Sequence, residues 1–377
     1  MPVHLCGAAA MSAALNVAVI GAGAGGAAAV AEAVLGGHRV SLWNRSLRTL
    51  QPFIERGGVE YEGLLGDGLA VPQRITGDMG EAVAGADVAL VCLPTLSHAP
   101  VAQALAQAGA HRLPVVLNPG HTGGALEFAA AYARASGGPV PPVAEFHTLA
   151  YIARKYQPAR VTVTGRAKFL RLGVLPGGEA AARHAQQLYP VAQRVTDVLD
   201  SSLANLNMVL HAPGAVLAAA WVEATRGDFT FYVQGMTPGV TRVMRELDAE
   251  RRAVARAFGH DLPAVAAEMQ RYGTVEPWVT DTDDLVHAIA SGEANKRIKA
   301  PDSLEHRYYR EDFGHGLLPF LEIARIAGVA TPVADALYRL GCTLTGTDFA
   351  AAGRTAAAMG IAGLDRAGLI ARVRGTA

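Results

Sequence analysis

An apolar strand pattern that ends abruptly in glycines is the feature that most constrains this chain. Residues 17–20 read Val-Ala-Val-Ile, and a G-x-G-x-x-G spacing follows, ahead of an alanine-rich helical pattern that runs to Leu35. In such a strand–turn–helix the first glycine permits a tight turn, the second lets a pyrophosphate approach the backbone, and the third allows close helix–strand packing. The phosphates then lie on free N–H groups at a helix N-terminus. The sequence therefore predicts a dinucleotide-binding site formed by Gly21, Gly23, Ala24 and Gly26.

The residues after the second predicted strand bear on which dinucleotide is bound. Residues 39–43 read as that strand, and NAD-binding sites usually place Asp or Glu just after it, to hold the ribose 2′-hydroxyl. This chain has Asn44, Arg45 and Ser46 there. A guanidinium and a hydroxyl suit a 2′-phosphate, and no carboxylate is present to repel it. We expect NADP(H) to be favoured, with NAD(H) possible; a solvated turn with an incidental arginine is the alternative.

Strand-like and helix-like patterns alternate up to about residue 190. This alternation predicts a doubly wound, mostly parallel sheet. Ligands gather at the carboxyl ends of such strands, here the loops at 94–98, which begins with Pro94, and 119–124. The predicted strands after the glycine turn and residues 39–43 are 86–94, 113–118, 160–165 and 169–175.

Beyond about residue 195 the strand signal disappears. We therefore expect an α/β protein in which a Rossmann-type doubly wound sheet is followed by an all-helical C-terminal domain. The expected divisions are an N-terminal tail at 1–14, a dinucleotide-binding domain at 15–193, and a helical substrate and dimerisation domain at 194–377. The predicted helices are 203–224, 240–258, 262–272, 317–327, 333–340 and 365–373.

Composition limits the partners and the compartment. The Lys+Arg count of 33 equals the Asp+Glu count of 33, so no nucleic-acid partner is expected. The three cysteines, Cys6, Cys92 and Cys342, lie far apart without a C-x-x-C pair, which favours a reducing compartment and no metal site. No basic signal region and no run of about 18 apolar residues is found. We expect a cytoplasmic protein without a membrane partner; Met1 and Met11 are both possible starts.

Two polar clusters interrupt the helical half. In residues 205–214, His211 is a solitary polar side chain on an apolar helix face, shortly before Pro213, which is expected to bend or end the helix. Residues 306–316 combine charged and aromatic side chains between apolar helices. A satisfied core histidine and a solvated loop are the ordinary alternatives, so neither cluster establishes a site by itself.

Together with the glycine turn, these clusters resemble the opine dehydrogenases, which include octopine and nopaline dehydrogenases and bacterial N-(1-carboxyethyl)amino-acid dehydrogenases. The resemblance covers nearly everything from Leu15 onward. Its most specific piece is residues 307–312, Arg-Tyr-Tyr-Arg-Glu-Asp, followed by Gly-Leu-Leu-Pro at 316–319. This is similar to the family's R-Y-x-x-E-D…G-L-V-P stretch. The other matching segments are 118–124, 205–211, 235–238, 248–251 and 345–364.

The resemblance implies a helical domain of the opine and 6-phosphogluconate dehydrogenase-like type and a reductive condensation. In such enzymes a 2-oxo acid and the amine of an amino acid form an imine, which the reduced nicotinamide attacks with hydride. By resemblance, His211 is the general acid/base, Asp312 orients its ring and favours its protonated form, and Arg307 clamps a substrate carboxylate. The resemblance also implies substrate-cleft residues, namely His121, Thr148 and Asn205.

Some features depart from the family pattern or leave other functions open. Ala212 separates His211 from Pro213, and Ala153 stands where several relatives carry cysteine, so the amino-acid substrate cannot be carried over. The alternatives are a 2-dehydropantoate reductase or β-hydroxyacid dehydrogenase-like enzyme, or a non-catalytic dinucleotide sensor. The first class generally uses a lysine early in the helical domain, and the helix around His211 has none. An exposed face of the helical domain would suit a homodimer.

Overall fold

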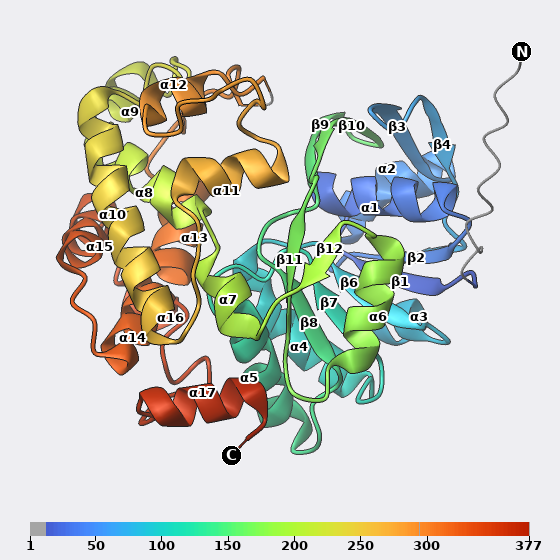
Figure 1. The fold of residues 1–377 in the computed structure, drawn as a ribbon. Coiled ribbons are helices and arrows are strands. Elements are labelled where there is room, and N and C mark those ends of the chain that lie inside the picture. The colour runs from blue at the N-terminus through green and yellow to red at the C-terminus, as the bar shows by residue number, and fades with distance from the viewer. Residues whose placement is uncertain (1–12, 294, 377) are drawn as a thin grey trace, which may run out of the picture.

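The structure, a computed structural model, describes residues 13–293 and 295–376. The predicted tail at 1–14, with Cys6 and Met11, therefore lies outside the described residues except for its last two positions. Within the described range a strand-rich half is followed by a helical half (Figure 1).

An eight-stranded sheet organises the strand-rich half. Its strand pairs are parallel except for the one between β8 and β11. The strands lie in the order β12 (Ala192–Arg194), β11 (Leu170–Val174), β8 (Val143–Phe146), β7 (Val115–Leu117), β6 (Val88–Val91), β1 (Asn16–Ile20), β2 (Arg39–Trp43) and β5 (Arg74–Thr76). The helices of this half are α1 (Ala24–Leu35), α2 (Leu47–Arg56), α3 (Met79–Val83), α4 (His98–Gln107), α5 (Gly124–Ser136) and α6 (Glu179–Leu188).

The central strand β1 is apolar along its length because both faces of the sheet are covered. Val17 and Val19 belong to one core, with residues of α1 and α6, whereas Ala18 and Ile20 belong to the other, with residues of α4 and α5. Alternate residues of a strand point to opposite faces, so a strand buried on both sides shows a continuous apolar run. The second core continues into the helical half, and the two halves therefore share packed surface.

A second, four-stranded sheet corrects one expectation. The strand predicted at 169–175 joins the main sheet as β11, but β10 (Arg160–Arg166) does not. The smaller sheet packs on α1 and has the order β4 (Gly68–Ala70), β3 (Val59–Gly63), β10 and β9 (Tyr151–Gln157). Along β10 only alternate residues are buried, the mark of a strand covered on one face, whereas β11 is buried throughout.

The helical half contains only helices and loops besides one isolated bridge, within the residues that the structure describes. The fold class predicted from the sequence, a Rossmann-type sheet followed by an all-helical domain, is confirmed. The helices are α7 (Val198–Leu203), α8 (Asn207–Leu217), α9 (Ala219–Thr225), α10 (Pro238–Ala257), α11 (Val265–Tyr272), α12 (Leu285–Ala290), α13 (Arg307–Asp312), α14 (Leu318–Ala327), α15 (Pro332–Thr345), α16 (Phe349–Ala352) and α17 (Arg366–Arg374).

Pro213 does not end its helix, which was one of the two outcomes expected of it. Helix α8 continues to Leu217, and the chain turns only at Ala218, between α8 and α9. Tight packing explains the continuation, because a Cβ at Gly214 would lie 2.7 Å from the ring of Phe231. Tertiary contacts of this kind outweigh the loss of one helical hydrogen bond at the proline.

Across the described part of the chain, no single helix is both long and apolar enough to cross a membrane. One pair, Val198–Leu217 with Ala219–Thr225, reaches that length and hydropathy only when taken together, with a bend of 67°.

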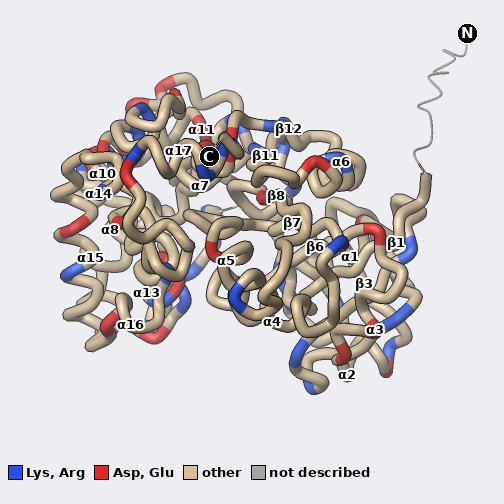
Figure 2. Tube along the Cα trace, turned by 90° about the horizontal axis from the view of Figure 1, so that it is seen from below, with Lys and Arg blue, Asp and Glu red and all other residues tan. Residues whose placement is uncertain are grey.

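Buried ion pairs join the two halves. Arg171, on β11, donates to Glu268 Oε1 of α11 at 2.6 Å and to Asp200 Oδ1 of α7 at 2.9 Å. Elsewhere, positive and negative residues are interspersed along both halves of the chain (Figure 2). The junction is therefore held by specific charge pairs in addition to the shared apolar core.

Candidate active site

The glycine turn between β1 and α1 has the geometry that a dinucleotide requires. Gly21 adopts φ +120°, and a Cβ there would lie 2.6 Å from the carbonyl oxygen of Cys92. A Cβ at Gly26 would overlap the Gly21 carbonyl, whereas the space beside Gly23 is open. Gly23 also precedes the first N–H groups of α1, beginning at Ala24, and no side chain caps this helix. The first and third glycines are thus needed for packing, and the second exposes backbone to a ligand, as the pyrophosphate of a dinucleotide requires.

The turn after β2 lies beside this glycine turn. Asn44 Oδ1 accepts a hydrogen bond from Ala22 N at 3.3 Å. Ser46 caps α2 by accepting from Thr49 N, and Arg45 between them is exposed. Backbone N–H groups, a hydroxyl and a guanidinium are therefore close to the position of the ribose in a Rossmann-type site.

Lys155 is a further cation at this end, and the sequence reasoning gave it no role there. It comes from β9 of the smaller sheet, and its Nζ donates to the carbonyl oxygen of Ala22 at 3.4 Å and lies 4.3 Å from the centre of the Phe53 ring. Burial lowers the pKa of Lys155. Since β9 was not predicted to pack on α1, only the fold reveals this approach.

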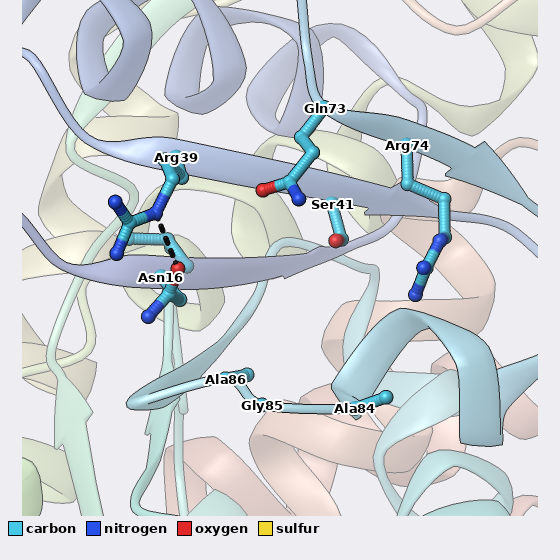
Figure 3. Close-up of a pocket in the computed structure, with 9 residues that line it drawn as sticks. Asn16, Arg39, Ser41, Gln73, Arg74, Ala84, Gly85 and Ala86 are labelled. Carbon is cyan, nitrogen blue, oxygen red and sulfur yellow. Dashed lines mark hydrogen bonds between the residues drawn. The ribbon is translucent and has the colours of Figure 1, made fainter.

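A polar pocket of about 250 Å³ lies at the opposite edge of the sheet (Figure 3). It opens beside the amino ends of β1 and β2, where Arg39 Nε donates to Asn16 Oδ1 at 2.7 Å. The remaining residues labelled in the figure are Ser41, Gln73, Arg74, Ala84, Gly85 and Ala86. Ligands of open α/β sheets bind at carboxyl ends, and this pocket lies away from the glycine turn, at the amino ends of the strands.

His211 and Asp312 meet between two helices of the helical half. His211 lies on α8 and Asp312 ends α13, and His211 Nδ1 is 2.7 Å from Asp312 Oδ2. Both residues are buried, with 6% and 4% of their surfaces exposed. Because a carboxylate accepts hydrogen bonds, the contact places the imidazole proton on Nδ1 and leaves Nε2 as the basic nitrogen.

Two tyrosines complete the surroundings of the imidazole. Tyr232 OH lies 2.7 Å from His211 Nε2, and the Tyr308 ring stacks on the imidazole with 3.8 Å between centroids and an angle of 14°. Burial raises the pKa of Tyr232 well above its usual range. Tyr232 therefore keeps its proton and donates to Nε2. Tyr232 lies in an apolar stretch without a recognisable motif, so no pattern in the sequence predicted its place beside His211.

Arg307 begins the helix that Asp312 ends. Its Nη2 is 2.8 Å from Glu311 Oε2, while more than half of the Arg307 side chain is exposed. Glu311 also accepts from the backbone N and the hydroxyl of Thr95, at 3.0 and 3.2 Å. Burial alone raises the pKa of Glu311, but the charge of Arg307 and these hydrogen bonds hold it below its usual value. The contact ties α13 to the loop that follows Pro94 and β6, at the carboxyl edge of the sheet.

The loop at 119–124 lies against the start of α8. His121 adopts φ 59°, and its Nε2 is 3.5 Å from Asn207 Nδ2. Burial lowers the pKa of His121 to about 4, with the charges of Glu311 and Asp312 opposing the shift. The imidazole of His121 is therefore neutral at pH 7. A left-handed backbone at a residue other than glycine is uncommon and occurs where the surroundings enforce it.

Asn205 and Thr148 take different places around this loop. Asn205 donates to Thr122 Oγ1 at 3.1 Å and accepts from Asn207 N at 3.0 Å, so its side chain links the loop to α8. Thr148 is half-buried beside Leu149, and a Cβ on Gly25 would lie 3.1 Å from Leu149. The structure thus brings the segment after β8 to the glycine turn and the loop at 119–124 to the helical half.

Arg354 is fully buried, although the sequence reasoning gave it no role. It donates to Glu127 Oε2 at 2.9 Å and to the carbonyl oxygen of Thr122 at 2.6 Å, and it approaches the carbonyl oxygen of Thr95 at 3.4 Å. One guanidinium from the segment between α16 and α17 therefore braces both loops of the strand-rich half. A lone arginine in an Ala- and Gly-rich tail was the only sign in the sequence.

Glu145 holds the other side of the loop at 119–124. It is buried, accepts from Ala125 N at 2.8 Å, and receives hydrogen bonds from Ser201 and Ser202 of α7. Burial raises the pKa of Glu145 to about 7.

Within residues 13–293 and 295–376, no group of three or more His, Cys, Asp or Glu side chains is arranged to hold a metal ion.

Comparisons with known proteins match the whole of this architecture. The family model described as NAD/NADP octopine/nopaline dehydrogenase, alpha-helical domain, matches residues 194–345. An opine dehydrogenase from Arthrobacter sp. (strain 1C) is 34% identical over 354 residues, which cover 93% of this chain and 97% of that protein.

Two solved structures share the fold along nearly the full length. Octopine dehydrogenase in complex with NADH and agmatine has a TM-score of 0.75 at 22% identity, covering 96% of this chain and 98% of its own. NADP⁺-bound yersinopine dehydrogenase has a TM-score of 0.70 at 14% identity, with the same coverage.

Proposed function

The chain belongs to the opine dehydrogenase family of NAD(P)H-dependent oxidoreductases, and we propose that it joins the amine of an amino acid to a 2-oxo acid at the His211–Asp312 pair. The observation that carries this proposal is the 2.7 Å contact between His211 Nδ1 and Asp312 Oδ2, formed by two helices far apart in sequence. When bound, the reduced nicotinamide supplies the hydride.

The protein's part in this reaction is to move protons and to orient the substrates. The His211 imidazole takes up a proton from the substrate ammonium, so that the amine can attack the 2-oxo carbon. The same ring returns protons to the carbinolamine oxygen, which leaves as water. Asp312 keeps the ring in one tautomer and stabilises it while it is charged. Imidazole suits this task because it both accepts and donates protons near neutral pH.

Arg307 is the proposed carboxylate-binding residue. Its guanidinium is mostly exposed and makes one ion pair, with Glu311, among the described residues, and the charge of Arg154 also reaches this site from β9. A carboxylate can therefore bind along the remaining edge of the guanidinium with two parallel hydrogen bonds. His121 and Thr148 are proposed to line the cleft, and Asn205 to position the loop that carries His121.

We favour NADPH as the reductant. Arg45, which is exposed, and the nearby Lys155 offer positive charge to a 2′-phosphate, and Ser46 at the start of α2 offers a hydroxyl, which supports this preference. Among the relatives, octopine dehydrogenase was solved with NADH and yersinopine dehydrogenase with NADP⁺, so the family itself allows either cofactor.

A homodimer is the proposed assembly. Leu217 and Trp221 are exposed at the end of α8 and on α9, and Leu340 and Leu344 are exposed on α15, which packs against α8. Sedimentation or light scattering at micromolar concentration tests this: a mass of one chain would exclude it. The cytoplasmic location stays a prediction from the cysteine spacing.

A substrate screen tests the proposed function. Purified protein is supplied with NADPH or NADH, each common amino acid, and pyruvate, glyoxylate or 2-oxoglutarate. We expect oxidation of the cofactor only when both an amine and a 2-oxo acid are present, with a product mass equal to the sum of the two reactants less one oxygen atom, because one water is lost and two hydrogen atoms are gained. Oxidation with a 2-oxo acid alone would instead indicate a hydroxyacid dehydrogenase.

A further inference from the structure

The basic nitrogen of His211 already has a partner. Tyr232 OH lies 2.7 Å from Nε2, while Nδ1 is held by Asp312 at the same distance. Both ring nitrogens of this imidazole are thus engaged by buried side chains, and 6% of each of His211 and Tyr232 is exposed. Any proton that His211 exchanges with solvent has to pass through one of these two contacts or through the reactants.

The reaction proposed above requires such an exchange in every turnover. In the condensation the ammonium nitrogen forms the C–N bond, two of its protons leave with the carbonyl oxygen as water, and a protonated imine remains. Hydride addition to the imine carbon gives a neutral secondary amine, which then takes one proton to become the ammonium product. One proton is therefore consumed from solvent per turnover, and the buried acid that delivers it has to be reloaded.

Asp312 cannot serve as the route by which His211 is reloaded. Asp312 is 4% exposed and ends a helix whose next residues, Phe313–Leu317, form a buried π-helical turn. On the other side, Tyr232 OH is 3.5 Å from Tyr308 OH, and Tyr308 is only half-buried. The Tyr308 ring also stacks on the imidazole. Of His211, Tyr232 and Tyr308, Tyr308 is therefore the most exposed, and its hydroxyl is the next group beyond that of Tyr232.

We propose that Tyr232 is the proton-relay group of His211, passing protons between Nε2 and the hydroxyl of Tyr308, a half-buried residue. A phenol suits this role because its oxygen accepts one proton while its O–H donates another, so the proton moves without a charged tyrosine. Burial raises the pKa of both hydroxyls, which keeps them protonated between transfers. This inference rests on the proposed function, since it concerns the same reaction.

The variant Tyr232→Phe removes the relay and keeps the ring. We expect kcat to fall about 30-fold, within reach of the ~10²-fold that a positioned acid or base can contribute, while NADPH binding and the melting temperature stay close to those of the wild type. The solvent isotope effect should report fewer protons in flight, and small buffer acids should restore activity in proportion to their concentration. Tyr308→Phe should give a weaker loss with the same dependence on buffer.

Tyr309→Phe is the matched control. Tyr309 directly follows Tyr308 in the sequence and is fully buried, and its hydroxyl donates to the carbonyl oxygen of Ala215 on α8 at 2.9 Å. Its loss should lower the melting temperature without any rescue by buffer and without a change in the proton inventory. Tyr232→Phe and Tyr309→Phe each remove one buried hydroxyl oxygen and keep the ring. A difference between the two variants therefore separates the effect of proton transfer from the effect of packing.

Several results would overturn the relay. If Tyr232→Phe loses activity but responds to no buffer and keeps the wild-type proton inventory, Tyr232 only positions His211. An increase in kcat/KM would show that the hydroxyl blocks the substrate instead. The comparison uses ratios to the wild type with the best substrate pair of the screen. A failure of the proposed function appears earlier, as a wild-type protein that condenses no amine with any 2-oxo acid.

Discussion

The glycine turn proposed to bind the dinucleotide and the proposed proton-transfer centre are built in opposite ways. The turn at 21–26 is six consecutive residues whose backbone makes the site, and an empty space beside Gly23 is its essential feature. The centre around His211 consists of side chains from α8, from the segment after α9 and from α13, and nearly every polar atom there has a partner. The first is local backbone geometry, and the second is a convergence of distant side chains.

This difference decides how each region responds to substitution. A change in the turn acts through sterics on one short segment. A change in the centre leaves a buried charge or hydrogen-bonding group without its partner, which costs more than the contact itself contributes. Substitutions in the centre should therefore give the larger effects, and those at the exposed end of the dinucleotide site the smallest.

The largest effect is expected for His211→Ala. Loss of the group that moves protons should lower kcat by about 10³-fold, while the dissociation constant for NADPH, measured by fluorescence titration, changes less than twofold. A loss of cofactor binding as large as the loss of turnover would contradict the assigned role. The melting temperature of the variant separates misfolding from catalysis.

Arg307→Lys keeps the charge at the centre but removes the planar fork. Hydrogen bonds to charged groups contribute about 1.5–3 kcal/mol, so the KM for the 2-oxo acid should rise about 10- to 100-fold. The KM for NADPH and the solvent isotope effect should stay unchanged. The measurement uses initial rates at saturating amino acid while the concentration of the 2-oxo acid is varied. An unchanged KM for the 2-oxo acid would show that Arg307 does not bind the carboxylate.

Two alanine variants divide the glycine turn into its two tasks. Gly26→Ala places a methyl group against the Gly21 carbonyl and should destabilise the fold by at least the ~1–3 kcal/mol typical of overpacking. Gly23→Ala meets open space, so it should leave the melting temperature unchanged and weaken NADPH binding. Thermal unfolding with and without NADPH tests both. Equal loss of stability in the two variants would show that the turn has no exposed backbone to offer a ligand.

The smallest effect is expected for Arg45→Ala, because the guanidinium is exposed. An exposed ion pair contributes up to about 1 kcal/mol, so the KM for NADPH should rise by about fivefold or less while the KM for NADH stays the same. Lys155→Ala serves as a comparison, since the Lys155 ammonium is half-buried near Ala22 and should matter more. Equal effects on both cofactors would remove the 2′-phosphate assignment.

The sequence predicted what depends on contiguous patterns. The glycine spacing predicted the turn, and strand and helix periodicity predicted the two-part architecture, because these features follow from backbone sterics and side-chain alternation. The pairing of His211 with Asp312, 101 positions apart, came instead from a family resemblance. The fold supplied Tyr232, Lys155 and Arg354, since each acts through an approach between elements that no local pattern encodes.

The smaller sheet shows that a strand can be predicted correctly while the sheet that it joins is not. The strand at 160–165 was predicted, but its sheet was not, although the alternate burial of β10 corresponds to alternating Val and Thr in the sequence. Likewise, Pro213 was expected to bend or end α8, and packing at Gly214 carries the helix past it. Helix and strand propensities describe which conformations a segment tolerates. Tertiary contacts with other elements decide which conformation the segment adopts and which sheet it joins.

The contacts of Arg354 have a consequence for the order of events on the ribosome. Arg354 is translated 232 residues after Thr122, to whose carbonyl oxygen it donates. Its ion pair with Glu127 likewise forms only after Arg354 has been added. Because domains fold from the N-terminus as the nascent chain emerges at roughly 5–20 residues per second, the glycine turn can form tens of seconds before Arg354 is available to brace the loops at Thr95 and Thr122. A half-made chain could thus recognise its nucleotide but could not use it.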